Sequence, residues 1–391
     1  MFDAVPSSPH DLRAVAFFLP QYHPVPENDA FWGKGFTEWR NVVQAVPRFR
    51  GHDQPHLPAD LGFYDLRLAE TRAAQAELAR NAGLAGFCYY HYWFSGRRVL
   101  SAPFDAVLDS GQPDFPFMLC WANENWTRAW DGGAQHILLE QRYSDEDTRA
   151  HARHLARAFS DTRYIRIDDR PVFAIYNADE IPCPQRWCDV FREAAQAEGH
   201  RPYLIRVERY LDRDRRSPVA LGFDAALEFQ PFSRSFLRWL QTRPDLKHHL
   251  HRRLANRLRR TIRQSQYWRE FDVHHDMQAF VAFDASQTPP DYTCFPGVCP
   301  SWDNSARRPP GKGIIFRKSS PGLFADWLAG KANRFGPPTA DENLVFVNAW
   351  NEWAEGNHLE PCLRHGHAWL DAVRLGLARH RTAPKGCPEN T

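Results

Sequence analysis

The sequence lacks several features that mark whole classes of protein. No run of about 18 consecutive apolar residues occurs, so we expect no membrane-spanning helix. Residues 1–13 contain no basic start followed by an apolar segment, so we expect no secretory signal and a cytoplasmic location. Basic and acidic side chains nearly balance, at 49 and 47, which gives no general attraction to nucleic acid. We therefore predict no nucleic-acid partner.

Recognisable cofactor motifs are also lacking. The spacings of Cys183 and Cys188, and of Cys294 and Cys299, differ from those of zinc sites, so we predict no metal. Without a secretory signal the eight cysteines are expected to be reduced thiols. No glycine-rich phosphate loop follows the first apolar run, and no Asp-x-Asp stretch stands out as a clear metal motif. We accordingly predict no cofactor.

Aromatic residues, by contrast, are abundant, with 14 Trp, 12 Tyr and 27 Phe. Large rings fill protein cores, and they also form flat platforms on which sugar rings stack. The core explains many of them, but it explains less well why Trp121 and Trp126 stand beside Asn123, Glu124 and Arg128. This grouping favours a carbohydrate-binding role.

Short apolar runs alternate with longer helical patterns along the chain, which is typical of βα units around a parallel sheet. Several of the runs are continuously apolar, as in strands that are buried on both faces. The eight predicted strands are Arg13–His23, Gly86–Phe94, Pro116–Trp126, Pro171–Ala178, Tyr203–Glu208, Asp224–Pro231, Thr293–Asn304 and Asn343–Trp353. The predicted helices are Leu66–Ala82, Asp145–Phe159, Gln185–Ala197 and Pro321–Arg334.

Eight strands with intervening helices predict a single (β/α)₈ barrel over residues 1–391, in preference to an open doubly wound sheet. Two segments are longer than the ordinary connections between strands and helices of such a barrel. Val25–Asp60 predicts a long loop over the barrel mouth. Phe232–Gln278 predicts a basic helical insertion after the sixth strand, in which Leu250, Leu254, Leu258 and Ile262 form an apolar stripe.

The basic part of this insertion, Arg252–Arg263, allows two interpretations. It either packs on the barrel with a solvated charged face, or contacts an anionic membrane surface peripherally.

In a (β/α)₈ barrel the active site lies at the carboxyl ends of the strands. Besides Glu38 in the first loop, the polar and aromatic residues at those predicted ends are Gln21, Tyr22, His23, His91, Trp93, Asn123, Glu124, Trp126, Arg128, Tyr176, Asn177, Arg206, Glu208, Glu228, Gln230, Trp302, Asp303, Asn351, Glu352 and Glu355. They include no Ser or Cys nucleophile elbow. Carboxylates, amides and aromatic platforms suit glycosyl chemistry, in which two carboxylates act on the scissile bond.

Glu352 and Glu355 form the best candidate pair. If a helix begins after the eighth strand, the two side chains lie on one face, close enough for one pKa to rise. The alternative is structural, with one Glu capping a helix and the other in an ion pair with an Arg at the rim. The position between Trp350, Trp353 and Gly356 favours catalysis.

Four segments carry a resemblance to a known family. They are FFLPQYHPVPENDAFWGKGFTEWRNV, GFCYYHYWF, WANENWTRAWDG and NAWNEWAEGNHLEP. They resemble the WbsX-type polysaccharide-biosynthesis proteins, which are similar to the endo-α-mannosidase glycoside hydrolases. The resemblance implies a (β/α)₈ barrel and a role in bacterial surface polysaccharide or O-antigen metabolism.

The endo-α-mannosidases carry a similar Trp-Asn-Glu-Trp-x-Glu-Gly run. By that motif Glu352 would act as base on the 2-hydroxyl of the sugar, and Glu355 as general acid and base. The implied route retains configuration through a 1,2-anhydro sugar. WbsX-type proteins are commonly labelled glycosyltransferases, so a glycosyltransferase and a non-catalytic glycan-binding protein stay as alternatives to a retaining endo-type hydrolase or transglycosylase.

We expect an oligosaccharide or polysaccharide substrate, free or lipid-linked. Glu352 and Glu355 are the predicted catalytic residues. The predicted substrate-binding residues are Tyr22, His23, Trp39, His91, Asn123, Glu124, Trp126, Arg128, Asn177, Asn351 and Trp353. Of these, His23 and His91 are also open to a structural interpretation, as satisfied core histidines.

Overall fold

The computed structural model describes residues 12–128, 133–242 and 272–382. Its main sheet is a barrel of parallel strands in the order β10-β9-β8-β4-β2-β1-β15. The seventh strand of the barrel consists of two pieces that flank Pro296. Piece β12 pairs with β10 and piece β13 pairs with β15, both in parallel, which closes the ring. The predicted (β/α)₈ barrel is therefore confirmed.

All eight predicted strands are present, but most end earlier than predicted. The barrel strands are β1 (Arg13–Phe18), β2 (Gly86–Phe94), β4 (Phe117–Trp121), β8 (Arg170–Ile175), β9 (Tyr203–Glu208), β10 (Ala225–Glu228), β12 (Cys294–Phe295), β13 (Gly297–Val298) and β15 (Leu344–Val347). Strands β4 and β9 are buried at every residue, as expected for strands covered on both faces. The polar residues that follow the strands belong to the loops of the rim, which the predicted ranges had included.

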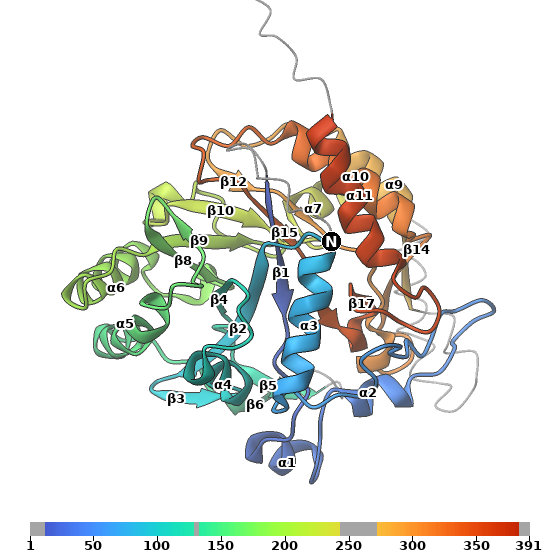
Figure 1. Ribbon diagram of the computed structural model, residues 1–391, viewed down its shortest axis with the longest axis horizontal. Coiled ribbons are helices and arrows are strands. Elements are labelled where there is room, and N and C mark those ends of the chain that lie inside the picture. Colours follow the sequence, from blue (N-terminus) through green and yellow to red (C-terminus); the bar gives the residue numbers. More distant parts are fainter. Residues whose placement is uncertain (1–11, 129–132, 243–271, 383–391) are drawn as a thin grey trace, which may run out of the picture.

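The helices lie outside the barrel, as Figure 1 shows for α5, α6, α10 and α11. The helices are α1 (Pro26–Trp32), α2 (Trp39–Gln44), α3 (Ala69–Asn81), α4 (Ala102–Ser110), α5 (Asp145–Phe159), α6 (Pro184–Ala197), α7 (Arg234–Gln241), α9 (Met277–Ala285), α10 (Pro321–Arg334) and α11 (Ala368–Thr382). The four predicted helices are confirmed within three residues at each end. Ser144 caps α5 by accepting a hydrogen bond from the backbone N–H of Asp147, and Ser320 caps α10 in the same way with Leu323.

Short elements lie in the connections outside the barrel strands. Strand β3 (Arg97–Val99) extends β2 as a hairpin, β5 (Trp126–Arg128) pairs with β6 (Gly133–Leu139), and β7 (Arg166–Ile167) pairs with β8. The remaining elements are η2 (Ala178–Glu180), η3 (Val219–Leu221), β11 (Val273–Asp276), η5 (Asn304–Arg307), β14 (Ile314–Arg317), β16 (Asn351–Glu352), η6 (Trp353–Glu355) and β17 (Asn357–His358).

The two segments beyond the plain barrel differ in outcome. Val25–Asp60 is long, as predicted, and contains α1 and α2. The prediction that Phe232–Gln278 is helical is only partly right, because after α7 the segment ends in strand β11, which pairs in parallel with β14. Pairing with a distant strand has overridden the local helical pattern there. The basic stretch Arg252–Arg263 and its apolar stripe lie outside the described residues.

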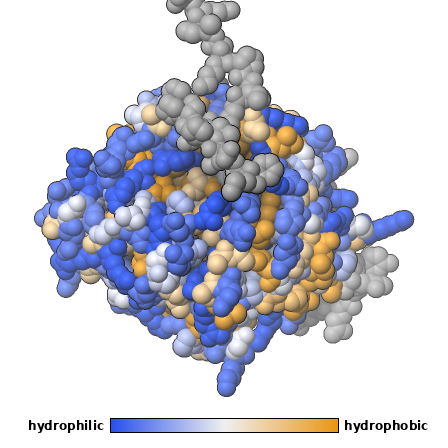
Figure 2. Space-filling view, viewed as in Figure 1, coloured by the Kyte–Doolittle hydropathy of each residue, from blue (hydrophilic) through white to orange (hydrophobic). Residues whose placement is uncertain are grey.

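No helix within the described ranges is long and apolar enough to cross a membrane. The face seen in Figure 2 is predominantly hydrophilic, with smaller apolar areas between the polar ones.

Gly297 is where the barrel closes, and it tolerates no side chain. A Cβ atom there would lie 2.0 Å from the backbone oxygen of Glu228 on the neighbouring strand. We expect Gly297→Ala to lower the free energy of unfolding by about 3 kcal/mol or more, because β10 and β13 would have to move apart. Gly322→Ala in α10 is the matched control, since its Cβ meets nothing within 4 Å. Denaturant unfolding that gave equal stabilities for both variants would contradict this explanation.

Candidate active site at the barrel mouth

A pocket of about 460 Å³ opens at the carboxyl ends of the barrel strands. We call it the mouth pocket. Residues at the end of β2 and residues that follow the other seven strands line it, from Leu19 after β1 to Glu355 after β15. The full lining is Leu19, Gln21, Tyr90, Tyr92, Phe94, Ala122, Glu124, Asn125, Trp126, Tyr176, Arg209, Tyr210, Leu211, Phe229, Phe232, Trp302, Asn304, Arg307, Arg308, Ile314, Glu352 and Glu355. This is where active sites of (β/α)₈ barrels lie.

Glu352 and Glu355 sit on a tight turn rather than on the α-helix that we considered as one possibility. Glu352 ends β16, which pairs with β17, and Glu355 ends the short 3₁₀-helix η6. Gly356 then adopts a left-handed conformation with φ of +55°, which reverses the chain and which a glycine adopts without strain. The turn still brings both carboxylates to the mouth pocket.

Tyr22 and Asn351 hold this turn from below. The Asn351 side chain accepts a hydrogen bond from the Leu19 backbone N–H at 2.7 Å and donates one to the Leu19 carbonyl at 3.0 Å. The Tyr22 hydroxyl donates to the Asn351 carbonyl at 2.6 Å and accepts from the Trp353 N–H at 3.2 Å. The end of the first strand therefore fixes the backbone of the last one.

Arg307 connects three carboxylates in one cluster. Its guanidinium contacts Glu352 at 2.9 Å, Glu355 at 2.8 Å and Glu38 at 2.6 Å, each through a different nitrogen. Glu38 comes from the long first loop and is fully buried, while Arg307 ends η5 after the seventh strand. The ion pair to a rim Arg that we considered as a structural alternative is thus present, and it involves both Glu residues.

The cluster retains a proton near neutral pH. Burial raises the pKa of Glu352 to about 8, an effect that Arg307 opposes and that the charges of Glu355 and Glu38 reinforce. Burial raises the pKa of Glu355 as well, again against the effect of Arg307. Three carboxylates around one guanidinium would carry a net charge of −2 if all were ionised, which a buried site disfavours. The cluster can therefore both donate and accept a proton.

Glu360 supports the turn from the core. Its carboxylate accepts hydrogen bonds from Trp353 Nε1 at 2.6 Å, from the Tyr64 hydroxyl at 2.8 Å and from Gln75 Nε2 at 2.6 Å. Burial raises the pKa of Glu360 to about 7, although the three donors lower it. Trp353, held this way, stacks on His358 with ring centroids 3.7 Å apart.

We expect Glu360→Ala to lower the free energy of unfolding by about 3 kcal/mol or more, because three buried donors would lose their acceptor. Glu360→Gln should cost less, since its amide oxygen still accepts from Trp353 and Tyr64. Denaturant unfolding measures both. The control is Glu70→Ala on the exposed side of α3, where we expect a change within about 0.5 kcal/mol. Equal stabilities of the two alanine variants would refute the supporting role of Glu360.

The opposite wall of the mouth pocket carries a second polar group. Glu124 contacts Arg209 at 2.6 Å and accepts a hydrogen bond from Asn177 Nδ2 at 2.8 Å. The Arg209 guanidinium lies over the Tyr176 ring, 4.6 Å from its centroid. Trp126 is half-buried and stacks on Tyr92 with centroids 5.9 Å apart. The pocket thus offers carboxylate, guanidinium and ring surfaces to a ligand.

Most of the predicted substrate-binding residues lie beneath the pocket surface rather than on it. Tyr22, Asn351 and Trp353 are buried in the support of the turn that carries Glu352 and Glu355. Trp39 is buried beside them and donates from Nε1 to the Tyr64 carbonyl. His23 is 1% exposed, and burial lowers its pKa to about 4, so it is neutral.

The other predicted residues divide between the surface and the layer below it. His91 lies against His151, with the two Nε2 atoms 3.0 Å apart, and burial lowers its pKa to about 3. Asn123 is buried and orients Asn177 by accepting from its backbone N–H at 2.7 Å. Only Glu124 and Trp126 line the mouth pocket. Arg128 ends β5, and its side chain lies outside the described residues.

Arg307 and Arg209 were missed by the sequence reasoning. Arg307 follows the predicted seventh strand by three residues, in Ser305-Ala306-Arg307-Arg308, and Arg209 directly follows the fifth. A pair of buried carboxylates needs a cation nearby, which was the available signal. That signal does not indicate which of the many arginines in the rim loops supplies the cation.

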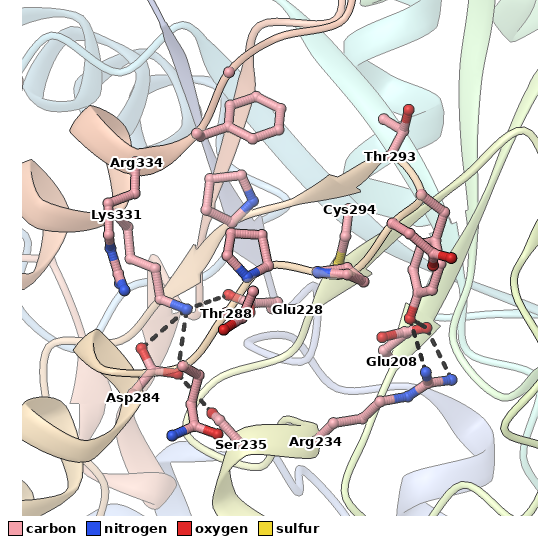
Figure 3. Close-up of a pocket in the computed structure, with 18 of the residues that line it drawn as sticks. Glu208, Glu228, Arg234, Ser235, Asp284, Thr288, Thr293, Cys294, Lys331 and Arg334 are labelled. Atoms are coloured by element: carbon pink, nitrogen blue, oxygen red, sulfur yellow. Dashed lines mark hydrogen bonds and ion pairs between the residues drawn. The ribbon is translucent and has the colours of Figure 1, made fainter. Parts of the chain in front are cut away.

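A larger cavity of about 680 Å³ lies on the flank of the barrel (Figure 3). It holds Glu208 and Glu228, which end β9 and β10 as predicted but line this cavity and not the mouth pocket. Lys331 of α10 contacts Glu228 at 2.6 Å and Asp284 at 2.9 Å, while Arg234 of α7 contacts Glu208 at 2.9 Å. These charges pair with one another, and the cavity shares no lining residue with the mouth pocket. We therefore place the candidate active site at the mouth.

Residues 14–373 match the model of a family described as "Glycosyltransferase WbsX". The chain belongs to the WbsX family. The predicted resemblance is thereby confirmed over nearly the whole chain.

Two relatives of this WbsX protein come from strains of Xanthomonas campestris pv. campestris, and both are described as an uncharacterized protein WxcX. Each is 44% identical over 371 residues, which make up 93% of this chain and 49% of the relative. The chain thus spans about half the length of the curated relatives it matches.

Solved structures share the fold at low sequence identity. A glycoside hydrolase-like protein has a TM-score of 0.57 at 15% identity and covers 94% of both chains. The GH99 endo-alpha-mannosidase of Bacteroides thetaiotaomicron, bound to bis-tris propane, has a TM-score of 0.56 at 12% identity, covering 96% of this chain and 98% of its own. The WbsX protein therefore has a glycoside hydrolase-like barrel.

Proposed function

We propose that this WbsX protein is a carbohydrate-active enzyme, namely a retaining endo-type glycoside hydrolase or transglycosylase of bacterial surface polysaccharide metabolism. One observation carries the proposal: the cluster of Glu352, Glu355 and Glu38 around Arg307 at the barrel mouth. Glycosyl transfer needs one carboxyl group that gives a proton to the leaving oxygen and one carboxylate that takes a proton on the other side. A shared guanidinium keeps both groups adjacent and lets them hold different charges.

In the first step Glu352 takes the proton of the 2-hydroxyl while that oxygen attacks C1 of the same sugar. The bond from C1 to the leaving oxygen breaks, and Glu355 protonates that oxygen, which leaves a 1,2-anhydro sugar. In the second step Glu355 takes a proton from water or an acceptor hydroxyl, which attacks C1 and reopens the ring, and Glu352 returns its proton to the 2-oxygen. Two inversions give retention.

The roles of the two Glu residues are taken from the family motif. One property of the site, the raised pKa of Glu352, argues against its role as the base. A pKa of about 8 favours the acid form of Glu352 at neutral pH, whereas a base must be ionised. The two carboxylates share Arg307, so a proton moved from Glu352 to Glu355 stays within the cluster. We therefore assign the pair to the chemistry, and test the division of roles by substitution.

For substrate contact we retain Glu124 and Trp126 from the sequence prediction and add Tyr92, Tyr176 and Arg209 of the same pocket. The aromatic rings offer faces on which a sugar ring can stack. Glu124 and Arg209 offer an acceptor and a donor for hydroxyl groups. A peripheral membrane contact through Arg252–Arg263 and a lipid-linked substrate stay as further proposals.

A glycosyltransferase is the second candidate, because the family description names that activity. The same cluster supports it in one form: an acceptor hydroxyl replaces water in the second step, and the enzyme transfers the sugar without a nucleotide. The third candidate, a non-catalytic glycan-binding protein, would use the mouth pocket without the chemistry.

The test is a time course of the purified protein on α-linked manno- and rhamno-oligosaccharides, analysed by mass spectrometry in ¹⁸O-labelled water. Shorter products that carry one ¹⁸O atom would support the hydrolase, and longer unlabelled products the transglycosylase. Product growth only after nucleotide sugars are added would overturn the proposal in favour of a nucleotide-dependent transferase. Oligosaccharide binding without turnover, equal in the Glu352→Gln, Glu355→Gln double variant, would leave the glycan-binding protein.

A further inference from the structure

A third cavity, of about 710 Å³, lies behind the turn that carries Glu352 and Glu355, which we call the catalytic turn in view of the proposed function. We call it the histidine pocket, because five histidines line it together with basic, acidic and aromatic residues. Its lining comprises Phe49, Gly51, His52, Asp53, His56, His274, His275, Asp276, Ser301, Trp302, Asp303, Ile315, Phe316, Arg317, Lys318, Ser319, Gly356, Arg364, His365 and Trp369. Segments distant in the sequence thus meet at one place on the rim.

The histidine pocket shares a wall with the mouth pocket. Trp302 lines both cavities. The next residue, Asp303, donates its backbone N–H to the Glu355 carbonyl at 2.6 Å. A Cβ atom on Gly356 would lie 3.0 Å from Cβ of Asp303, so the two backbones pack directly. A ligand in this pocket would therefore be separated from the catalytic turn only by the Trp302–Asp303 segment.

Most charged side chains of the histidine pocket form ion pairs with one another, but one basic side chain does not. Lys318 pairs with Asp276 at 2.6 Å, Arg364 with Asp53 at 2.7 Å, and His52 with Asp303 at 2.6 Å. Arg317 has no carboxylate partner within the described residues. Its guanidinium lies over the Phe49 ring, 5.1 Å from the centroid, and it is exposed to solvent. An acidic ligand would find a forked donor here that needs no internal ion pair to break.

The walls also contain polar groups that lack partners. Trp302 Nε1 and His274 Nδ1 are buried and have no hydrogen-bond partner among the described residues. A buried polar atom left without a partner is costly and calls for an explanation, such as a ligand or water. Phe49 stacks on His52 with centroids 4.3 Å apart and presents a half-buried ring beside Arg317. The edge of an aromatic ring, unpaired ring nitrogens and a cation together match a polyhydroxylated ring with an acidic substituent.

We propose that the histidine pocket binds a sugar ring that carries a carboxylate or phosphate group. Arg317 holds the acid group, the edge of the Phe49 ring lies beside the sugar, and Trp302 Nε1 and His274 Nδ1 meet its hydroxyl groups. The choice of a sugar as the ring rests on the proposed function, whereas the acidic group follows from the charges of the pocket alone. The substrate would then be an acidic glycan whose charged residue lies outside the mouth pocket.

Binding is tested on the full chain by ligand-observed NMR with glucuronic acid, glucose 6-phosphate, glucose and inorganic phosphate. We expect both acidic sugars to bind more tightly than glucose and than phosphate alone. Arg317→Met should weaken the acidic sugars at least about 10-fold, as expected for the loss of a charge-assisted hydrogen bond. Arg364→Met is the matched control in the same pocket, with a change below about 3-fold, because Arg364 is already paired with Asp53.

Glu355→Gln separates this site from the mouth pocket, since it should leave the affinities of the acidic sugars unchanged. The binding assay needs no turnover. If the protein were inactive on every oligosaccharide, the proposed function would be wrong, but the assay would still test ligand binding in this pocket. Three results would overturn the inference: no binding of either acidic sugar, equal affinity for glucose, or equal affinities in the Arg317→Met and parent proteins. If phosphate bound as tightly as glucose 6-phosphate, the pocket would be a simple anion site. The inference that it recognises a sugar would then be wrong.

Discussion

Glu355→Gln is expected to lower turnover of the cleaved oligosaccharide by about 10²- to 10⁴-fold, the range typical of a lost general acid–base group. The amide has the shape of the carboxyl group but gives up no proton and takes none. Glu352→Gln is expected to cause a loss of the same order. Initial rates measured by mass spectrometry, with circular dichroism to check that both variants fold, provide the test.

An activated substrate distinguishes the two roles. An aryl glycoside with an acidic phenol needs little protonation to leave, so Glu355→Gln should recover much of the first step on it. Glu352→Gln should not recover, because the 2-hydroxyl still requires a base. The reverse pattern would exchange the roles, as the raised pKa of Glu352 favours. Near-parental turnover of both variants on the natural linkage would exclude two-Glu catalysis.

Arg307→Met is expected to lower turnover by about 10²- to 10³-fold and to shift the pH profile upward. Arg307 lowers the pKa of both Glu352 and Glu355, so its removal raises both. The rising limb of the profile requires an ionised base and moves to higher pH. The falling limb requires a protonated acid and moves in the same direction. The whole bell-shaped curve of kcat/KM should therefore move to higher pH.

Two further variants make this result interpretable. Arg307→Lys keeps the positive charge but not the three-way fork, so we expect a smaller shift in pH and partial activity. Arg142→Met is the surface control, because Arg142 is exposed and pairs only with exposed Glu140. Activity lost in Arg307→Met without any movement of the pH profile would show that Arg307 shapes the loop rather than the protonation of the carboxylates.

The order of strands and helices was readable from the sequence because the signal is local. A strand such as β4 is apolar at nearly every residue, and α5 begins with a capping Ser followed by acidic residues. The ends of strands were less readable, since the rim loops after them are also rich in Trp and Tyr. Within Phe232–Gln278 the local pattern favoured a helix, and at Val273–Asp276 pairing of β11 with β14 gave a strand instead.

The candidate site was predictable in part for the same reason. Glu352 and Glu355 stand in one short motif, so the sequence alone pointed to them. Glu38 and Arg307 lie 269 residues apart in the chain and meet only because the first loop and the seventh share the barrel mouth. Burial likewise depends on the whole fold, and it places Tyr22 and Asn351, both predicted to bind sugar, beneath the pocket surface, where they support the turn.

The sequence by itself determined the barrel, the family and the motif that holds the two Glu residues, because each is written in neighbouring residues. Only the tertiary structure decided which cation meets those carboxylates, which rings reach the pocket surface, and that a second pocket with Arg317 lies behind the turn that carries the two Glu residues. The physical reason is that charge pairing and burial depend on distance in space. Loops from eight strands converge at one end of the barrel whatever their separation along the chain.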